Sequence, residues 1–318
     1  MLYMTQLSTQ AAPQPGKVKK KRDYNAITPV WNVIFNIIIG LFSFSCVFPF
    51  LFVIIISLTD EQTLVQEGFS LFPSQFSIAA YDYIFRSGSE LISSFGVTLL
   101  VTVLGTLLSL VLVTSYAYAL SRRSFEFRGF FSFLAFFTML FSGGMVPGYI
   151  VMTQFLHLQN TIWSLIFPLS MSAFFIIVMR TFFQTTVPDE IIESAKIDGA
   201  GEFLTFVKIV LPVSLPGIAT IGLFSSLGYW NDWFNALLYY NNPQKTPPLQ
   251  FMLMQIEKNM DFLTKNAQNI GSFDMAASLP TETVRMAMVV LATAPIVLAY
   301  PFFQRYFVQG LTVGSVKG

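Results

Sequence analysis

Charged residues are scarce in this sequence of 318 residues. Asp, Glu, Lys and Arg together make up 11% of the chain, whereas about a quarter is usual for a globular protein. Hydrophobic residues make up 54%, and a water-soluble fold could not bury that much apolar surface. The formal net charge is only +1, so we expect no nucleic-acid partner. The composition therefore excludes an ordinary soluble domain.

Cysteine and histidine are also nearly absent, and Cys46 and His157 are the single examples. One cysteine cannot form an intrachain disulfide, and with one histidine it cannot build a zinc site or a thiol–imidazole pair. The chain has no phosphate-binding loop of the type G-x-x-x-x-G-K-[ST]. We therefore expect no metal, no cofactor bound by this chain and no enzymatic activity of its own.

Long apolar runs dominate the rest of the sequence. A helix needs roughly 20 apolar residues to cross a bilayer core of about 30 Å, and several runs reach that length. The predicted fold is therefore all-α, a polytopic membrane protein with six transmembrane helices. We place these helices near Trp31–Leu58, Ile92–Leu120, Phe130–Met152, Thr161–Met179, Val213–Tyr240 and Met286–Val308.

The third predicted span is the least regular. Ser142, Gly143, Gly144 and Pro147 interrupt it. Glycine and proline inside a membrane helix mark either a kink with close helix packing or a broken helix that lines a transport pathway. The sequence leaves both interpretations open.

The distribution of Lys and Arg predicts the orientation, because these residues are retained on the cytoplasmic side. With the N-terminus inside, thirteen of the eighteen basic residues fall in cytoplasmic segments. Both termini are then cytoplasmic. Residues 1–30 form a basic tail beside anionic lipid, and residues 31–308 form the membrane domain. Outside the membrane we expect a short helix at Tyr81–Phe85 and a long polar loop at 241–285, which is large enough to touch another protein.

The cytoplasmic segment from Thr186 to Pro216 reads TVPDEIIESAKIDGAGEFLTFVKIVLPVSLP. Pro188 suits the first turn of a helix, and the two acidic residues after it suit the positive N-terminal end. Apolar residues then recur at helical spacing on one side. They are Ile191, Ile192 and Ala195.

Gly199 and Gly201 interrupt this helix. A second apolar stripe follows with spacings i, i+3, i+4 and i+7, and it predicts a second helix. Its residues are Phe203, Phe206, Val207 and Val210. The sequence therefore predicts two short helices joined by a glycine bend. Periodicity alone leaves open whether they dock on a soluble partner or form an ordinary connector between two spans.

The same segment matches a spaced motif: E-A-A, three residues, G, nine residues, I-x-L-P. Ser194 is the one departure, a small residue in place of alanine. The segment resembles the coupling loop of ATP-binding-cassette importer permeases, which here spans residues 186–212. The resemblance implies contact with ATPase subunits. The residues expected to make it are Glu193, Ser194, Ala195, Asp198, Gly199, Ile209, Leu211 and Pro212.

The resemblance extends beyond the loop. Phe141–Gly148, Tyr229–Asp232 and the segment 305–318, RYFVQGLTVGSVKG, are similar to the carbohydrate-importer branch, and within it to maltose-type and polysaccharide-type permeases. This implies a second, related permease, two ATPase subunits that bind ATP and Mg, an external solute-binding protein and membrane lipid as partners. It also implies that an oligosaccharide crosses the bacterial cytoplasmic membrane by alternating access.

Two alternatives remain open at this point. One is a permease of the same build for another solute, such as an amino acid, a polyamine or phosphate. The other is a secondary carrier or channel, which would need coupling ions and usually more spans or an obvious repeat. The segment Glu193–Pro212 argues against the carrier or channel.

A carboxylate within an apolar run marks a second candidate site, because such a group is costly in a membrane helix. Asp232 lies in GYWNDWFNALLYY, residues 228–240. Aromatic rings stack on sugar rings, while amides and carboxylates bind hydroxyls. We therefore predict that Tyr229, Trp230, Asn231 and Asp232 line the substrate path. The alternative is an aromatic belt at the outer interface, with Asp232 capping or bonding a neighbouring helix.

The resemblance also assigns a role to the cytoplasmic C-terminal tail, residues 309–318. In maltose-type permeases this tail inserts between the two ATPase subunits. The implied contacts here are Gln309, Gly310, Leu311, Thr312, Gly314 and Lys317. A frayed chain end is the alternative.

Overall fold

The computed structural model describes residues 29–86, 88–270 and 281–315. In these ranges the regular elements are helices, accompanied by an isolated bridge between Thr59 and Phe76, so the all-α prediction is confirmed there. The chain divides into two compact units, residues 1–51 and 52–318. The predicted basic tail lies outside the described residues up to residue 28.

The first unit holds most of α1 (Pro29–Ser57), an uninterrupted apolar helix. Residues Val30–Ser57 are long and apolar enough to cross a membrane. Side chains on all sides of the helix are exposed, including Ile39, Leu41 and Phe42. A helix that is apolar all round suits a bilayer or a bundle of membrane helices. The predicted first span agrees with α1.

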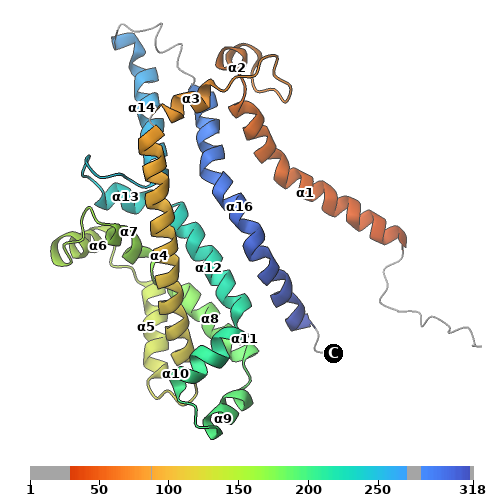
Figure 1. Ribbon diagram of the computed structural model, residues 1–318, viewed down its shortest axis with the longest axis vertical. Coiled ribbons are helices and arrows are strands. Elements are labelled where there is room, and N and C mark those ends of the chain that lie inside the picture. The colour runs from red at the N-terminus through yellow and green to blue at the C-terminus, as the bar shows by residue number, and fades with distance from the viewer. Residues whose placement is uncertain (1–28, 87, 271–280, 316–318) are drawn as a thin grey trace, which may run out of the picture. The chain divides into compact units, whose positions relative to one another are not determined.

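The second unit is built around α4 (Gly88–Ser121). This helix packs against α8 (Ala173–Thr186) and α12 (Leu215–Trp230), and α12 packs in turn against α16 (Thr281–Ser315) (Figure 1). The second predicted span agrees with α4. A buried apolar cluster joins α4, α8 and α12. It includes Val113, Ala117, Ile176, Met179 and Ile221.

Two glycines let these helices approach closely. A Cβ atom at Gly105 of α4 would lie 2.5 Å from the ring of Tyr229 on α12. A Cβ atom at Gly217 of α12 would lie 2.8 Å from the ring of Phe182 on α8. Membrane helices commonly associate through such small residues, because the backbones can then come close enough to pack.

The third predicted span is a broken helix. It consists of α5 (Arg128–Leu140), α6 (Met145–Ile150) and a π-helical turn (Val151–Phe155), and the two halves meet at 112°. Gly144, just before α6, has φ +88°, a left-handed angle that glycine adopts without strain. Of the two interpretations that the sequence left open, the structure shows the break. That this break lines a transport pathway stays a prediction.

The fourth predicted span is also bent. It begins with α7 (Ile162–Ile166) and a 3-10 turn (Phe167–Leu169), and it continues into α8 at an angle of 53°. Pro168 in the 3-10 turn has no backbone donor to continue a regular helix.

The fifth predicted span was wrong as a single helix over Val213–Tyr240. Before it come α10 (Glu202–Thr205), a π-helical turn (Phe206–Val210) and α11 (Leu211–Val213), which meet α12 at 81°. At its other end α12 stops at Trp230, and α13 (Phe234–Tyr239) follows. Proline at positions 212 and 216 brackets the first bend and removes backbone donors there.

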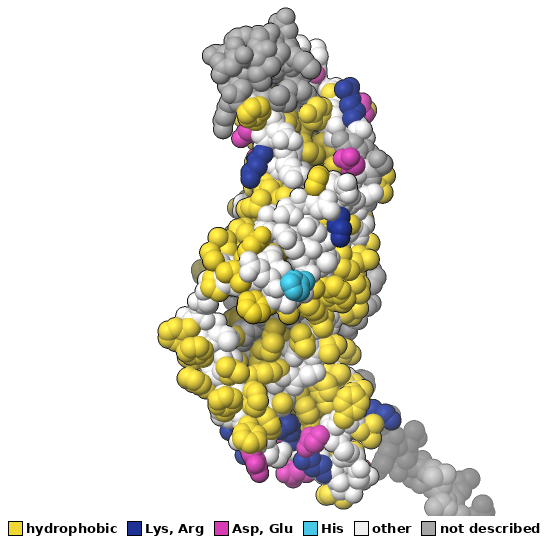
Figure 2. All heavy atoms as spheres, turned by 90° about the vertical axis from the view of Figure 1, so that its left-hand side faces the viewer, with side chains coloured by type: hydrophobic (Ala, Val, Ile, Leu, Met, Phe, Trp, Pro, Cys, Tyr) yellow, Lys and Arg dark blue, Asp and Glu magenta, His cyan; other side chains and the backbone are white. Residues whose placement is uncertain are grey.

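The sixth predicted span corresponds to α16, which runs from Thr281 without a break to Ser315 and contains Pro295 and Pro301. Among the described residues, three single helices are long and apolar enough to cross a membrane, or up to six if each bent pair is one span. The number six therefore stays a prediction. On one face, Figure 2 shows a broad hydrophobic region above an end where charged side chains gather.

The polar segments between the apolar runs fold as well. The expected helix at Tyr81–Phe85 is present as α3 (Ala79–Phe85), and α2 (Glu61–Glu67) precedes it. Much of the predicted loop 241–285 is a helix, α14 (Leu249–Ile270), which packs on α4 and α16. α14 packs through an apolar stripe on one of its faces, which consists of Leu249, Met252, Leu253, Ile256 and Met260.

The carboxylate of Glu61 joins α2 to α16. It accepts hydrogen bonds from the backbone N–H groups of Glu282 (3.1 Å) and Thr283 (3.0 Å) and from the hydroxyl of Thr283 (2.7 Å). A carboxylate at the first turn of a helix satisfies donors that the helix cannot satisfy itself. Glu61 therefore caps α16.

Candidate functional sites

The loop between α8 and α12 contains the two predicted helices. α9 (Asp189–Ile197) follows Pro188, and Gly199 stands after it with φ +83°. The N–H of Gly199 bonds to the carbonyl of Lys196 (3.0 Å), and the N–H of Ala200 bonds to that of Ala195 (2.9 Å). This pair of bonds is a Schellman motif, which ends a helix on a left-handed residue. The predicted glycine bend is confirmed.

The apolar residues predicted at helical spacing on α9 and in the second stripe are buried only in part. Ile192 and Ala195 are buried, and Ile192 belongs to the cluster of α4 and α8, but Ile191 is exposed. In the second stripe Phe206 and Val210 are buried, whereas Phe203 and Val207 are exposed. Residues 206–210 form a π-helical turn, which has more residues per turn than an α-helix and therefore does not keep the i, i+3, i+4 spacing on one face.

A polar cluster holds the bend against α4. The Tyr118 hydroxyl donates to Glu202 Oε2 (2.7 Å), and Lys196 Nζ lies 2.7 Å from Glu202 Oε1. The hydrogen bonds from Lys196 and Tyr118 hold the pKa of the Glu202 carboxyl below its ordinary value. Both Arg122 and Arg123 lie 3.7 Å from the carboxylate of Asp189 at the start of α9. The end of α4 therefore contacts both helices of the loop.

The predicted coupling residues lie on or near the surface of this loop. Glu193, Ser194 and Asp198 are exposed, and the Ser194 hydroxyl is bonded to the Glu190 carbonyl (2.9 Å). Ile209 and Leu211 are half-buried, Ala195 is buried and Pro212 is exposed.

Two apolar residues beside the bend are exposed, and the sequence analysis did not predict that they lie on the surface. Ile197 is 86% exposed and Phe203 is 79% exposed. Large apolar side chains on opposite sides of a glycine bend, each excluded from the chain's own core, are a signal for a surface that contacts another protein. The sequence analysis assigned Phe203 only to the second apolar stripe.

The four residues predicted for the substrate path divide into two pairs. Tyr229 is 3% exposed and donates to the Ile166 carbonyl (2.8 Å), while Trp230 is 6% exposed and donates to the Ala292 carbonyl (2.9 Å). Asn231 is exposed and Asp232 is half-buried at the break between α12 and α13. The buried pair therefore joins α12 to its neighbours, and the second pair stands at the break.

Asp232 also caps α13. Its carboxylate accepts hydrogen bonds from the backbone N–H (3.1 Å) and the side-chain amide (2.9 Å) of Asn235. Asn231 donates to the Leu227 carbonyl (2.9 Å). The capping alternative is thus present in the structure, and contact of Asn231 or Asp232 with a substrate stays a prediction.

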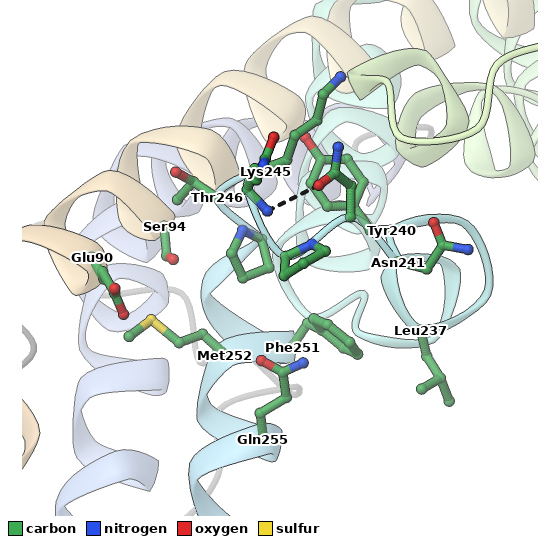
Figure 3. A pocket seen from close by; sticks show the side chains of 14 residues that line it. Glu90, Ser94, Leu237, Tyr240, Asn241, Lys245, Thr246, Phe251, Met252 and Gln255 are labelled. Carbon is green, nitrogen blue, oxygen red and sulfur yellow. Dashed lines mark hydrogen bonds between the residues drawn. The ribbon is translucent and has the colours of Figure 1, made fainter.

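A polar pocket of about 560 Å³ opens near α13 (Figure 3). Side chains from the start of α4, from the segment after α13 and from α14 line it, and they include Glu90, Tyr240, Lys245 and Gln255. The hydroxyl of Ser94 lines the same pocket and has no hydrogen-bond partner among the described residues. Donors, acceptors and an aromatic ring around one hollow suit a polyhydroxylated ligand. Sequence analysis missed this site because its residues come from two segments that lie far apart in the sequence, 90–94 and 237–255.

The predicted tail contacts are described only in part. The backbone of residues 309–315 continues α16 as a helix, whereas their side chains and residues 316–318, including Lys317, lie outside the described residues.

Residues 126–313 match the family of binding-protein-dependent transport system inner membrane components. The chain belongs to this family. It is a membrane-embedded transport subunit of a bacterial ATP-binding-cassette importer.

Individual relatives cover almost the whole chain. It is 43% identical over 278 residues to the polygalacturonan/rhamnogalacturonan transport system permease protein YtcP of Bacillus subtilis (strain 168), a match that covers 87% of this chain and 95% of the relative. It is 41% identical over 272 residues to protein LplC of the same organism, covering 86% and 90%. A crystal structure of a bacterial ABC transporter involved in the import of the acidic polysaccharide alginate aligns with TM-score 0.73 and 27% identity, covering 87% of this chain and 96% of that chain.

Proposed function

We propose that this chain is one permease half of an oligosaccharide importer, in which ATP hydrolysis by partner subunits is coupled to transport through the loop 186–212. The observation that carries this proposal is the loop itself. A Schellman turn at Gly199 presents exposed Ile197 and Phe203, and the polar cluster at Glu202 fastens the same turn to α4. A rigid projection with apolar residues at its end suits a groove on an ATPase subunit.

The contacts describe a route for the movement. A displacement of α9 and α10 acts on α4 through Tyr118 and Arg122, and α4 packs along α12. α12 ends at Tyr229 and Trp230, immediately before the break that holds Asp232. ATP-driven closure of the ATPase pair would therefore tilt the helices on either side of this break. Alternating access then follows from stabilisation of one conformation by bound ATP.

An oligosaccharide is the substrate that the chemistry and the relatives favour. Asn231 and Asp232 offer amide and carboxylate groups, and the pocket near α13 adds Glu90, Tyr240 and Gln255. Two of the similar proteins are named for the transport of polygalacturonan/rhamnogalacturonan and of alginate. The family resemblance therefore supports a sugar over the alternative solutes.

The assembly that we propose has a second, related permease, two ATPase subunits carrying ATP and Mg, and an external solute-binding protein. The six predicted spans place both termini in the cytoplasm and the segment 241–285 outside. The coupling contacts are the exposed Glu193, Ser194 and Asp198 together with Gly199. The tail contacts from Gln309 to Lys317 would reach the ATPase pair at the end of α16.

Reconstitution tests the proposal directly. The complex, purified with its binding protein, is placed in liposomes, and uptake of labelled oligogalacturonides is measured with and without ATP. We expect ATP-dependent uptake that is abolished without the binding protein. Uptake that proceeds without the ATPase subunits would contradict the coupling role. Mass spectrometry of sugar that co-purifies with the binding protein identifies the substrate, and an amino acid, polyamine or phosphate there would favour the alternative.

A further inference from the structure

Four arginines surround one cavity at the ends of three helices. The cavity has a volume of about 590 Å³ and lies where α4 ends, α5 begins and α8 ends. Its arginines are Arg122, Arg123, Arg128 and Arg180, and its single carboxylate belongs to Asp189. The lining therefore carries a formal excess of three positive charges.

These arginines are only partly satisfied within the described part of the chain. Asp189 lies 3.7 Å from Arg122 and from Arg123, whereas Arg128 and Arg180 form no ion pair with a carboxylate of the described residues. The Nε atoms of Arg122 and Arg180 are buried and have no hydrogen-bond partner among the residues that the structure describes. Buried donors of this kind are usually satisfied, and guanidinium groups bind phosphate with particular strength. An anionic group in this cavity would satisfy these donors.

An apolar cavity lies further along the same three helices. It measures about 370 Å³ and is lined by Tyr116 of α4, by Leu134, Ala135 and Thr138 of α5, and by Ala173 and Ile176 of α8, with Met171. On α5 the residues that line it follow Arg128 by six to ten positions, which is about 9–15 Å along a helix. The basic cavity is thus at the helix ends, and the apolar cavity is deeper in the bundle.

We propose that the groove between α4, α5 and α8 binds an anionic phospholipid, with its phosphate among the arginines and an acyl chain in the apolar cavity. Ser121, which lines the basic cavity, is the last residue of a candidate membrane span, so the phosphate stands at headgroup level. Phe130, Phe133 and Phe137 of α5 are exposed beside the groove. A free phosphate ion would make no use of these apolar surfaces, whereas a lipid uses both.

Such a lipid would also bear on the neighbouring loop, because Arg122 faces both the cavity and Asp189 of α9. It would fill the space between α5 and α8 on the first half of the broken third span. This proposal needs only that the chain lies in a membrane, and it does not depend on the transported solute.

Native mass spectrometry of the whole delipidated complex tests the proposal, because one spectrum reports bound lipid and subunit stoichiometry together. Phosphatidylglycerol is titrated against phosphatidylcholine with the same acyl chains. The Arg128→Gln/Arg180→Gln double variant is expected to bind phosphatidylglycerol roughly thirtyfold more weakly. The charge-matched control Arg86→Gln/Lys258→Gln, at positions outside both cavities, should bind it as the wild type does. Arg128→Lys/Arg180→Lys, which keeps both charges, should retain much of the binding and shows that loss is not misfolding.

Two further experiments distinguish a phospholipid from a soluble phosphate compound. Glycerophosphoglycerol, which has the headgroup but no acyl chains, should not displace the lipid at equal concentration. Thr138→Phe, an exposed position that lines the apolar cavity, should weaken lipid binding without changing any charge. The proposal is overturned if Arg128→Gln/Arg180→Gln and the control Arg86→Gln/Lys258→Gln bind phosphatidylglycerol equally well. It is also overturned if glycerophosphoglycerol competes as well as the lipid does, or if Arg128→Gln/Arg180→Gln loses ATPase subunits while phosphatidylglycerol binding is unchanged.

Discussion

The hydroxyl of Tyr118, near the end of α4, donates a 2.7 Å hydrogen bond to the carboxylate of Glu202, the first residue of α10. This bond joins a membrane helix to the second half of the glycine bend. Lys196 of α9 contacts the same carboxylate, so a single side chain connects three elements. The relationship predicts that the loop and α4 move together.

Tyr118→Phe removes this hydrogen bond and keeps the ring. With allowance for the exposure of Glu202, the lost stabilisation is about 1 kcal/mol, or roughly a fivefold shift between coupled and uncoupled arrangements. We expect uptake per ATP hydrolysed to fall by about that factor. Tyr116→Phe is the matched control, because its hydroxyl bonds instead to the Phe131 carbonyl at 3.0 Å. Equal coupling ratios in the two variants would contradict the prediction.

Gly199→Val should impair coupling, because φ of +83° is strained for a β-branched residue. The left-handed conformation then costs about 1–2 kcal/mol, and we expect this strain to disrupt the bend and leave the membrane domain folded. We expect reduced substrate-stimulated ATP hydrolysis in a complex that still assembles. Gly201→Ala is the control, since Gly201 has φ −72° and open space around it.

Gly199→Asn separates two causes of that loss. Asparagine tolerates the left-handed angle, so activity is retained if the backbone angle alone matters. If asparagine is as harmful as valine, a side chain at this position obstructs a partner, since a Cβ atom meets nothing within the chain. Stimulated hydrolysis at the wild-type rate in Gly199→Val would exclude both explanations.

Gly105→Ala should destabilise the packing of α4 on α12. The added Cβ atom would lie 2.5 Å from the Tyr229 ring, which is itself held by its bond to the Ile166 carbonyl. Overpacking of this kind costs about 1–3 kcal/mol. Thermal unfolding of the purified complex should show a lower midpoint. Gly96→Ala on the same helix meets no atom within 4 Å and should leave the midpoint unchanged or raise it.

Substitutions at Asp232 distinguish capping from transport. Asp232→Ala removes the cap of α13, a loss of about 1 kcal/mol, and also removes the charge. Asp232→Asn keeps a side-chain oxygen for the Asn235 N–H but is neutral. If the carboxylate contacts sugar, both variants lower uptake while basal ATP hydrolysis persists, and Asn231→Ala does the same. Normal uptake by Asp232→Asn alongside reduced stability of Asp232→Ala would leave capping as its only role.

The long helices could be predicted from sequence because apolar length alone determines them. α1 and α4 agree with their predicted spans, and the bend at Gly199 follows from the local demand for a left-handed residue. The sequence left the break before Met145 as one of two interpretations, and it did not predict the break after Trp230. They depend on local hydrogen bonds, such as those of Asp232, and periodicity does not record these.

The packing of distant segments could not be predicted either. The stripe on α14 is visible in the sequence as Leu249, Met252 and Leu253, but it lies in a segment taken for a loop because its overall composition is polar. The arginine cavity contains Arg122, which directly follows α4, and Arg180 of α8, and only tertiary packing brings them together. The sequence gives the number of arginines but does not show which of them lie close together in the folded chain.

The two prolines of α16 have a mechanical consequence. Pro295 and Pro301 provide no N–H, so the carbonyls of Leu291 and Val297 lose their usual helical donors. One end of the helix is clamped by Glu61, and Trp230 fastens its middle at Ala292. The helix is therefore held by fewer backbone hydrogen bonds around the prolines than elsewhere, and a bend costs least there. Movement imposed on the C-terminal part of α16 would then bend the helix near the prolines, and the N-terminal part, held by Glu61 and Trp230, would keep its orientation.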